Sequence, residues 1–272
     1  FQARKLRHTL ELPPQELLCF GDREMIAQVL HNVLNNAAKY AQTHIALQGT
    51  LEGFSEEAGG QLVLSVTDDG RGIDLAQQRT VFDKYVKLES QGGGSGLGLY
   101  ISRQMMELHH GDIGVESQPG QWTRFTIRLP NLFVPEQLPD LTPCQQRRVC
   151  ILSASKPTGQ LLEGVLVEAG LIELSQAGAP AQLDRLLSGP PPELIVVDLQ
   201  SELLAGHAAE RLPAGARVAW ILYGDPAEAA RLAPRLRGES GSVPAPLNPL
   251  LLLRQVSRLL EPAGGRGASA LH

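Results

Sequence analysis

The sequence predicts two α/β domains, and three observations carry this prediction. The chain has 272 residues, a length that favours two cores over one. Its first half combines strands bounded by glycines with two helices, and its second half alternates short apolar runs with helical stretches. Apolar strands that alternate with helices are typical of a parallel sheet covered on both faces. We expect domains at residues 1–133 and 147–262, a linker at 134–146 and a disordered tail at 263–272.

Five segments define the first domain. Residues 7–12 and 61–67 predict strands, and the second of them lies between glycine-containing turns. Asp22 is a suitable N-cap for a long helix, and another helix is expected at 97–108, after a run of glycines. Residues 122–129 alternate between mostly polar and mostly apolar side chains, which predicts a half-buried strand.

The second domain follows a stretch with three prolines and no helical periodicity, which predicts the linker. After this linker, short apolar runs alternate with helical patterns along the chain. The expected strands are 149–152, 194–199 and 218–222, and the expected helices are 159–169 and 249–260.

Composition excludes several classes of function. The formal net charge is −5, with 24 basic and 29 acidic residues and no basic run, so we expect neither a nucleic-acid partner nor a membrane-binding patch. No apolar stretch is long enough to cross a bilayer. Cys19, Cys144 and Cys150 form no CxxC pair, which favours reduced thiols in the cytoplasm. Because the sequence begins at Phe1 without an initiator methionine, we expect it to be part of a longer parent protein. Anchoring of that parent protein in a membrane is compatible with this expectation.

Polar side chains gather on one face of the first predicted helix. Asn32, Asn36 and Lys39 follow one another at helical spacing, beside a stripe of apolar residues. An amide oxygen suits Mg²⁺, and an ammonium group suits phosphate oxygens. Taken alone, such a face is more often simply solvated. The apolar stripe consists of Ile26, Val29, Leu30, Val33, Leu34 and Ala37.

Two glycine-containing segments are candidates for close contact with a ligand. The first is Asp68-Asp-Gly70-Arg-Gly72-Ile73 at a strand end, where the carboxylate can accept an exocyclic amine, although a plain turn has the same pattern. The second runs from Gly92 to Leu99 into a helix and supplies N–H groups suited to phosphate. The leucines between its glycines argue against a flexible linker, and neither a P-loop nor a dinucleotide-binding fingerprint is present.

Together, these segments resemble the catalytic ATP-binding domain of sensor histidine kinases, of the GHKL class with the Bergerat fold. The N box spans 32–40, the G1 box 68–73, the F box 81–85 (with Tyr85 where Phe is more usual) and the G2 box 94–99. Each box alone is weak evidence, but four in series are specific, and they cover nearly all of the first domain. The resemblance implies a two-layer α/β sandwich.

The resemblance also implies roles for individual residues. Asp68 would bind the adenine amine, Asn36 would hold Mg²⁺ and Asn32 would polarise the site near the γ-phosphate. Lys39 would contact phosphates and Tyr40 would pack on the nucleotide. Residues 74–93, including Lys84 and Lys87, would form a lid over the phosphates. The remaining implied nucleotide contacts are Gly70, Gly72, Ile73, Gly94, Ser95, Gly96, Leu97, Gly98 and Leu99.

This family phosphorylates a histidine in a helical dimerisation domain that precedes the ATP-binding domain. His8, His31, His109 and His110 do not lie in such a helix. We therefore expect the chain to bind ATP and Mg²⁺ without completing autophosphorylation alone. The implied partners are the upstream histidine domain of a homodimeric parent protein and a response regulator or partner kinase.

Residues 147–262 resemble a response-regulator receiver domain, which has a flavodoxin-like (βα)5 fold. Asp198 occupies the position of the phosphoacceptor. Ser153 and Ala154 replace the acidic pair, Tyr223 replaces Thr or Ser, and Ala245 replaces Lys. Without the acidic pair, Mg²⁺ loses its main ligands. The resemblance therefore implies a degenerate receiver, in which Asp198 is a vestigial carboxylate.

Three functions remain open. The first is the C-terminal part of a hybrid sensor histidine kinase in two-component signal transduction. The second is a related ATPase or an anti-sigma-type serine kinase, against which Lys39-Tyr40 and the F box argue. The third is a regulatory scaffold that binds ATP and a partner kinase without phosphotransfer.

Overall fold

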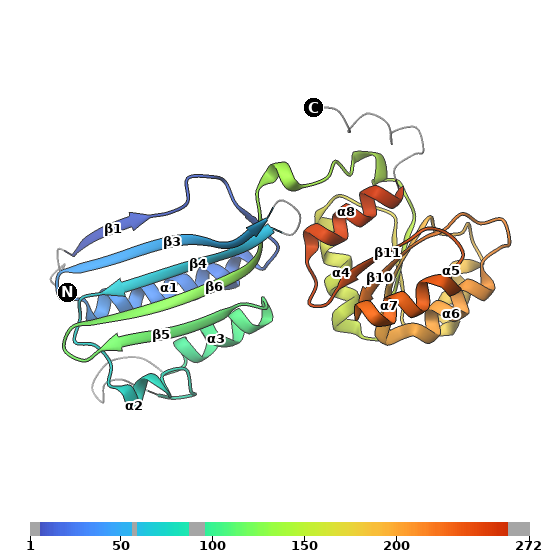
Figure 1. The fold of residues 1–272 in the computed structure, drawn as a ribbon. Coiled ribbons are helices and arrows are strands. Elements are labelled where there is room, and N and C mark those ends of the chain that lie inside the picture. Colours follow the sequence, from blue (N-terminus) through green and yellow to red (C-terminus); the bar gives the residue numbers. More distant parts are fainter. Residues whose placement is uncertain (1–5, 56–58, 87–95, 261–272) are drawn as a thin grey trace. The chain divides into compact units, whose positions relative to one another are not determined.

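A computed structural model describes residues 6–55, 59–86 and 96–260. The chain divides into two compact units, Phe1–Pro135 and Glu136–His272, each with its own sheet (Figure 1). Among the described helices, none combines the length and the apolar character that a bilayer crossing needs. The tail expected to be disordered lies outside the described residues.

The sheet of the first unit has the order β1-β3-β4-β6-β2, and β5 also pairs with β6. The β1–β3 pair is parallel, and the other pairs are antiparallel. The strands are β1 (Arg7–Glu11), β2 (Leu18–Cys19), β3 (His44–Ser55), β4 (Gly59–Asp68), β5 (Asp112–Gln118) and β6 (Trp122–Phe133).

Two long helices, α1 (Arg23–Tyr40) and α3 (Gly98–Leu108), cover one face of this sheet (Figure 1). The carboxylate of Asp22 accepts hydrogen bonds from the first backbone N–H groups of α1, which confirms the predicted N-cap. The short helix α2 (Leu75–Gln78) precedes α3. The result is the expected two-layer α/β sandwich. Buried in its core are Val29, Val33, Ala37, Leu64, Val66, Ile73, Val81, Phe82, Met106, Ile113, Phe125, Ile127, Leu129 and Leu132.

Three strands of this sheet, β2, β3 and β5, are absent from the sequence-based prediction, and β2 has only two residues. The strand β3 contains Gly49 and Gly53, which interrupt its alternation of apolar and polar residues. The strand β5 presents only two apolar side chains to the core, Ile113 and Val115. The strand β3 is held by pairing with β1 and β4, and β5 is held by pairing with the longer β6. Local patterns do not report such long-range contacts.

The second unit contains a five-stranded parallel sheet with the order β11-β10-β9-β7-β8. Helices lie on both faces (Figure 1), so β7 and β9 are buried along their whole length. The strands are β7 (Val149–Leu152), β8 (Leu174–Ala177), β9 (Leu194–Asp198), β10 (Ala219–Gly224) and β11 (Ser240–Pro244). The helices are α4 (Lys156–Glu168), α5 (Pro180–Leu187), α6 (Glu202–Arg211), α7 (Pro226–Leu232) and α8 (Pro249–Leu260).

The segment expected as a linker, 134–146, differs from an extended connection. It contains two short 3-10 turns, Pro135–Gln137 and Thr142–Cys144, and the second contacts α8. Leu141 and Cys144 are buried. Most of this segment therefore belongs to the second unit, because its apolar side chains complete that core.

The carboxylate of Asp69 fastens the start of β3 to the end of β4. It accepts hydrogen bonds of 2.6–3.1 Å from the backbone N–H groups of Gln42, Thr43 and His44 and from the Thr43 hydroxyl. Partial burial opposes ionisation, but these bonds outweigh it and hold the pKa of Asp69 well below its usual range. The ionised group therefore stabilises the fold above its ordinary pKa, and this contribution is lost in acid.

We predict that Asp69→Ala lowers the free energy of unfolding at pH 7 by about 2 kcal/mol, because several charge-assisted hydrogen bonds are lost together. Urea unfolding followed by circular dichroism measures the change. Asp83→Ala, which removes an exposed carboxylate from the same unit, is the matched control and should change stability by less than about 0.5 kcal/mol. Equal effects of the two substitutions would contradict the role of Asp69.

Candidate functional site

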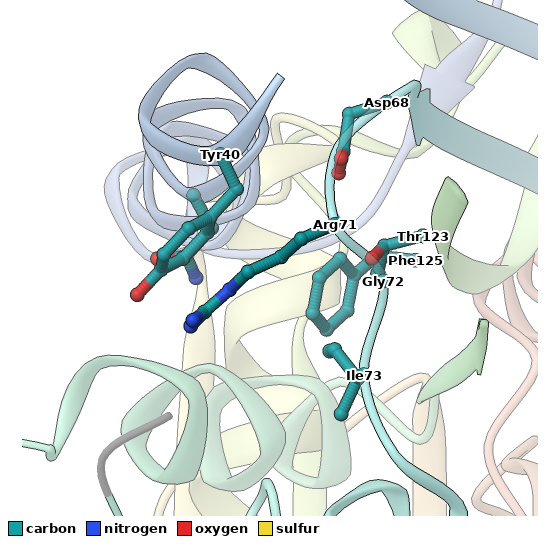
Figure 2. Close-up of a pocket in the computed structure, with 8 residues that line it drawn as sticks. Tyr40, Asp68, Arg71, Gly72, Ile73, Thr123 and Phe125 are labelled. Atoms are coloured by element: carbon teal, nitrogen blue, oxygen red, sulfur yellow. The ribbon is translucent and has the colours of Figure 1, made fainter. Parts of the chain in front are cut away.

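The candidate site lies where α1, β4 and β6 meet in the first unit. The end of α1 forms one side, the turn after β4 forms the second, and the start of β6 forms the floor (Figure 2). Its lining residues are Asn36, Tyr40, Asp68, Arg71, Gly72, Ile73, Thr123 and Phe125.

Asp68 is the most deeply placed polar group of the pocket, with 1% of its surface exposed. One carboxylate oxygen, Oδ1, accepts a hydrogen bond of 2.9 Å from the Gly70 N–H. Oδ2 has no hydrogen-bond partner among the described residues. Every fully buried side-chain nitrogen or oxygen of these residues has a partner, so Oδ2 is not fully buried and faces the pocket. A ligand with an N–H donor can therefore supply a hydrogen bond to Oδ2.

Burial raises the pKa of Asp68 to about 6. The Gly70 N–H lowers the pKa and the nearby charge of Asp69 raises it, but desolvation is the largest cause. Asp68 is thus ionised at neutral pH and protonated in mild acid.

The turn after β4 approaches its neighbours so closely that only glycine fits at two positions. A Cβ on Gly70 would lie 2.5 Å from the carbonyl oxygen of Tyr40. Gly72 has a φ of +71°, and a Cβ there would lie 2.2 Å from the carbonyl oxygen of Gln118. These contacts hold the backbone against the pocket beside Asp68.

The floor of the pocket is apolar and firmly held. Ile73 and Phe125 are buried, and the Phe125 ring packs edge-on against Phe82 with 6.3 Å between centroids. Beneath them, the Ser117 hydroxyl accepts a hydrogen bond from the Ile73 N–H and lies 3.2 Å from the Thr123 hydroxyl. A flat apolar group can therefore pack on a rigid surface next to the carboxylate.

The side of the pocket formed by α1 carries Tyr40, whose ring has two cations close to it. The ammonium of Lys39 lies 4.7 Å from the centre of the Tyr40 ring and donates a hydrogen bond to its hydroxyl. The guanidinium of Arg71 lies 5.2 Å from the same centre (Figure 2). Two positive charges thus lie beside Tyr40, where they would attract an anionic part of a ligand.

The two asparagines of α1 have different surroundings. Asn36 lines the pocket, and its carboxamide has no hydrogen-bond partner among the described residues. The amide of Asn32 instead donates to the Gly98 carbonyl oxygen and to the Ser102 hydroxyl, at 3.3 and 3.1 Å. Asn36 is available to a ligand, whereas Asn32 joins α1 to the start of α3.

The described part of the second glycine segment leads directly into α3. Gly96 has a φ of +70°, and a Cβ there would lie 2.8 Å from the backbone of Tyr85, so the G2 and F boxes pack together. Leu97 is the N-cap, and no side chain caps the first turn. Leu99 packs against the core. Gly94, Ser95 and Lys87 lie outside the described residues, as does the end of the expected lid.

In the second unit, both carboxylate oxygens of Asp198 have partners. Asp198 ends β9 and is 3% exposed. The Ser153 hydroxyl donates to its Oδ2 at 2.8 Å, and the Gln200 N–H donates to its Oδ1 at 3.1 Å. Burial, followed by the negative charge of Asp198, raises the pKa of Tyr223, which is the paired residue on β10.

Sequence reasoning did not identify Arg71, Thr123 or Phe125 as pocket residues. Thr123 lies opposite Asp68 in the antiparallel pairing of β4 and β6. The alternation along β6 separates Thr123 and Phe125 from the outward-facing residues, but it does not give the register with β4. Arg71 lies inside the G1 box, but this motif is recognised by its aspartate and glycines and does not indicate a role for the arginine.

Residues 21–132 match the family described as "Histidine kinase-, DNA gyrase B-, and HSP90-like ATPase". The chain is 33% identical over 182 residues to the circadian input-output histidine kinase CikA of Thermosynechococcus vestitus, covering 61% of the chain and 24% of the relative. It is 28% identical over 259 residues to CikA of Synechococcus elongatus, covering 89% and 33%, respectively. It is also 35% identical over 133 residues to the adaptive-response sensory kinase SasA of a Synechocystis strain, covering 48% and 34%.

Residues 21–132 are therefore similar to the ATPase domains of histidine kinases, which supports the resemblance carried by the four boxes. The chain spans between about a quarter and a third of the length of these relatives.

We predict that Asp68→Asn stabilises the ligand-free protein at pH 7.5 by about 1–2 kcal/mol. The folded-state pKa of about 6 exceeds the ordinary value of 3.8, so this group's contribution to stability falls as pH rises between these values. Asparagine carries no charge, so its burial does not have this desolvation cost. Thermal unfolding at pH 7.5 and pH 4 measures the effect, which should vanish at the lower pH. Asp74→Asn, at an exposed carboxylate, is the control, and a destabilised Asp68→Asn protein would contradict the prediction.

Proposed function

We propose that this chain is the ATP-binding and receiver-like part of a hybrid sensor histidine kinase in two-component signalling. The first unit would bind Mg-ATP and supply the γ-phosphate to a histidine of the parent protein's dimerisation domain. The second unit would not be phosphorylated. The observation that carries the proposal is the buried Asp68, with one oxygen directed into a pocket between the N box and the G1 box.

In this proposal, an adenine ring binds beside Asp68. The exocyclic amine would donate to Oδ2, since Oδ1 is already bonded to the Gly70 N–H. The ring would pack on Ile73 and Phe125, and Tyr40 would flank it. Adenine is distinguished from guanine because guanine presents a carbonyl oxygen where adenine presents the amine, and two oxygen acceptors repel each other.

The phosphates would extend towards Lys39 and the first turn of α3. The ammonium of Lys39 lies next to the Tyr40 ring, and no side chain caps the N-terminus of α3, whose first backbone N–H groups can bind phosphate. Asn32 would contribute by holding Gly98 in place, through its hydrogen bond to the Gly98 carbonyl oxygen. Such a site works mainly by positioning the nucleotide and neutralising its charge.

The donor set of the pocket suits Mg²⁺, which prefers oxygen ligands. Asn36 presents a carboxamide without a partner among the described residues, and the phosphates would supply further oxygens. Bound there, Mg²⁺ would neutralise phosphate charge. In our proposal, Asn36 is the protein ligand of the metal.

The second unit is proposed to be a receiver-like domain that has lost phosphoryl transfer. Its strand order, with β7 between β8 and β9 and followed by β10 and β11, is that of flavodoxin-like folds. Asp198 occupies the phosphoacceptor position, but Ser153 stands where an acidic metal ligand is needed and satisfies Asp198 by a hydrogen bond. This arrangement supports a role in binding a partner rather than in carrying phosphate.

We predict that the chain binds Mg-ATP and that Asp68→Asn weakens this binding at least tenfold, because an amide placed there loses the acceptor charge. Asn36→Ala should weaken binding about tenfold with Mg²⁺ and much less without it. Isothermal titration calorimetry gives both values. Unchanged affinity in Asp68→Asn would contradict the proposed adenine contact.

The ATP affinity should also fall with pH. Since Asp68 accepts the amine in its ionised form and its pKa is about 6, affinity at pH 5 should be about tenfold below that at pH 7.5. The Asn36→Ala protein keeps Asp68 and should show the same relative decrease. A flat profile for both proteins would exclude this carboxylate as the titrating group.

Phosphotransfer is tested in the full-length parent protein with γ-labelled ATP. We expect label on a histidine in the wild type, no label in Asn36→Ala and undiminished label in Asp198→Ala. Absence of label in a wild-type protein that binds ATP would favour the regulatory scaffold. Label that depends on Asp198 would contradict the receiver-like assignment and favour an active relay.

A further inference from the structure

A cavity of about 250 Å³ lies in the second unit, away from Asp198. It opens at the edge where β7, β8 and β9 begin, whereas Asp198 stands at the end of β9. At about 30 Å³ per water molecule, it has room for a side chain the size of leucine. It is lined by Arg148, Cys150, Glu173, Leu174, Ser175, Leu186, Leu187, Pro190 and Pro192.

Four polar side chains form an ordered array in this cavity. Val149 pairs with Leu174 and Cys150 pairs with Ser175 in the parallel ladder, so Arg148 and Glu173 stand next to each other at the strand starts. Residues two apart on a strand share a face. Arg148 and Glu173 therefore lie at the mouth, with Cys150 and Ser175 deeper in the cavity. The remaining lining is apolar.

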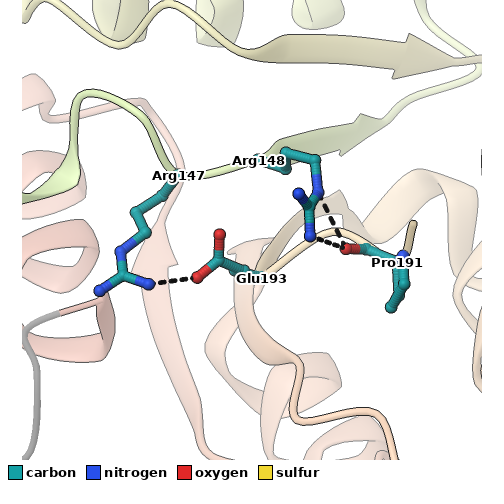
Figure 3. Close-up of polar contacts among 4 residues, drawn as sticks. All are labelled: Arg147, Arg148, Pro191 and Glu193. Atoms are coloured by element: carbon teal, nitrogen blue, oxygen red, sulfur yellow. Dashed lines mark hydrogen bonds and ion pairs between the residues drawn. The ribbon is translucent and has the colours of Figure 1, made fainter.

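One wall of the cavity is held in place by the start of β7 (Figure 3). Arg148 donates from Nε and Nη2 to the Pro191 carbonyl oxygen, at 3.2 and 3.1 Å. The guanidinium of Arg147 pairs with the Glu193 carboxylate, and the Glu193 N–H donates to the Arg148 carbonyl oxygen. The loop before β9 is thus fastened on both sides, and a preformed wall lowers the entropic cost of binding.

The two charges at the mouth do not neutralise each other directly. Within the described part of the chain, no ion pair joins Arg148 to Glu173, although they stand on neighbouring strands. The bonds to Pro191 leave Nη1 of Arg148 without a partner among the described residues, and the same holds for the Glu173 carboxylate. Below them, burial raises the pKa of Cys150 to about 11, so the thiol is neutral at physiological pH.

We propose that this cavity binds a small apolar zwitterion of the α-amino acid type. The ligand carboxylate would receive hydrogen bonds from Nη1 of Arg148, and its ammonium would donate to Glu173. Both ligand charges are attached to one carbon, which suits two protein charges on strands about 5 Å apart. The apolar side chain would fill the space between Leu186, Leu187 and the proline wall, above the neutral Cys150 and Ser175.

Binding of L-leucine to the whole chain tests this inference, with isothermal titration calorimetry as the readout. We expect a Kd on the order of 1 mM for a ligand of this size. The carboxylate 4-methylpentanoate and the amine 3-methylbutylamine each keep one charge and should bind at least about tenfold more weakly. L-alanine, which lacks the apolar bulk, should also bind about tenfold more weakly.

Substitutions at the mouth of the cavity assign the binding to this site. Glu173→Gln and Arg148→Met should each weaken L-leucine binding about tenfold, whereas Glu168→Gln and Arg217→Met change exposed charges elsewhere in the unit and should leave it unchanged. Near-ultraviolet circular dichroism of the buried Trp220 verifies that each variant is folded. Equal binding of 4-methylpentanoate and L-leucine, insensitivity to Glu173→Gln in a folded protein, or no binding of L-leucine at 20-fold the expected Kd (about 20 mM) would each overturn the proposal.

Discussion

The burial of a single carboxylate, that of Asp68, is the constraint on which the first unit depends. A buried charge without a nearby cation is costly, and here it persists because Gly70 donates to one oxygen while the other faces the pocket. The arrangement requires a turn without a side chain at Gly70, since a Cβ would meet Tyr40 and Asp68 itself. It also requires the β4–β6 register that brings Thr123 opposite Asp68. The pocket is thus specified by backbone geometry as much as by its polar side chains.

Two adjacent aspartates show how the same chemical group acquires opposite properties. Asp68 ends β4 and is buried at the pocket, whereas the next residue, Asp69, faces the loop before β3. Burial dominates for Asp68 and raises its pKa to about 6, whereas four donors around Asp69 lower its pKa. One aspartate is therefore poised for a ligand at a cost in stability, and the other fastens the sheet. Asp198 in the second unit differs from Asp68, because Ser153 and Gln200 already satisfy both of its oxygens.

Local signals in the sequence predicted the elements that carry the nucleotide-binding boxes. Asp22 marks the start of α1, and the glycines mark the turn after β4 and the start of α3, because capping and positive φ depend on nearby residues. The strand β3 and the pocket floor at Phe125 could not be found in this way, since pairing between distant strands determines them. The same reason hides the cavity at the start of β7, where residues of two strands and a loop meet. The use of Asn32 to join two helices is likewise a tertiary contact that its motif does not reveal.

The most direct test of this account is the pKa of Asp68 itself, measured by carbon-13 NMR of its side-chain carboxyl group with and without Mg-ATP. We predict a pKa of about 6 in the free protein, because burial disfavours the charge. With ATP bound, the pKa should be lower by at least about one unit, because the adenine amine stabilises the ionised form. A value near 4 in the free protein, or one that ATP does not change, would contradict the proposed role of Asp68.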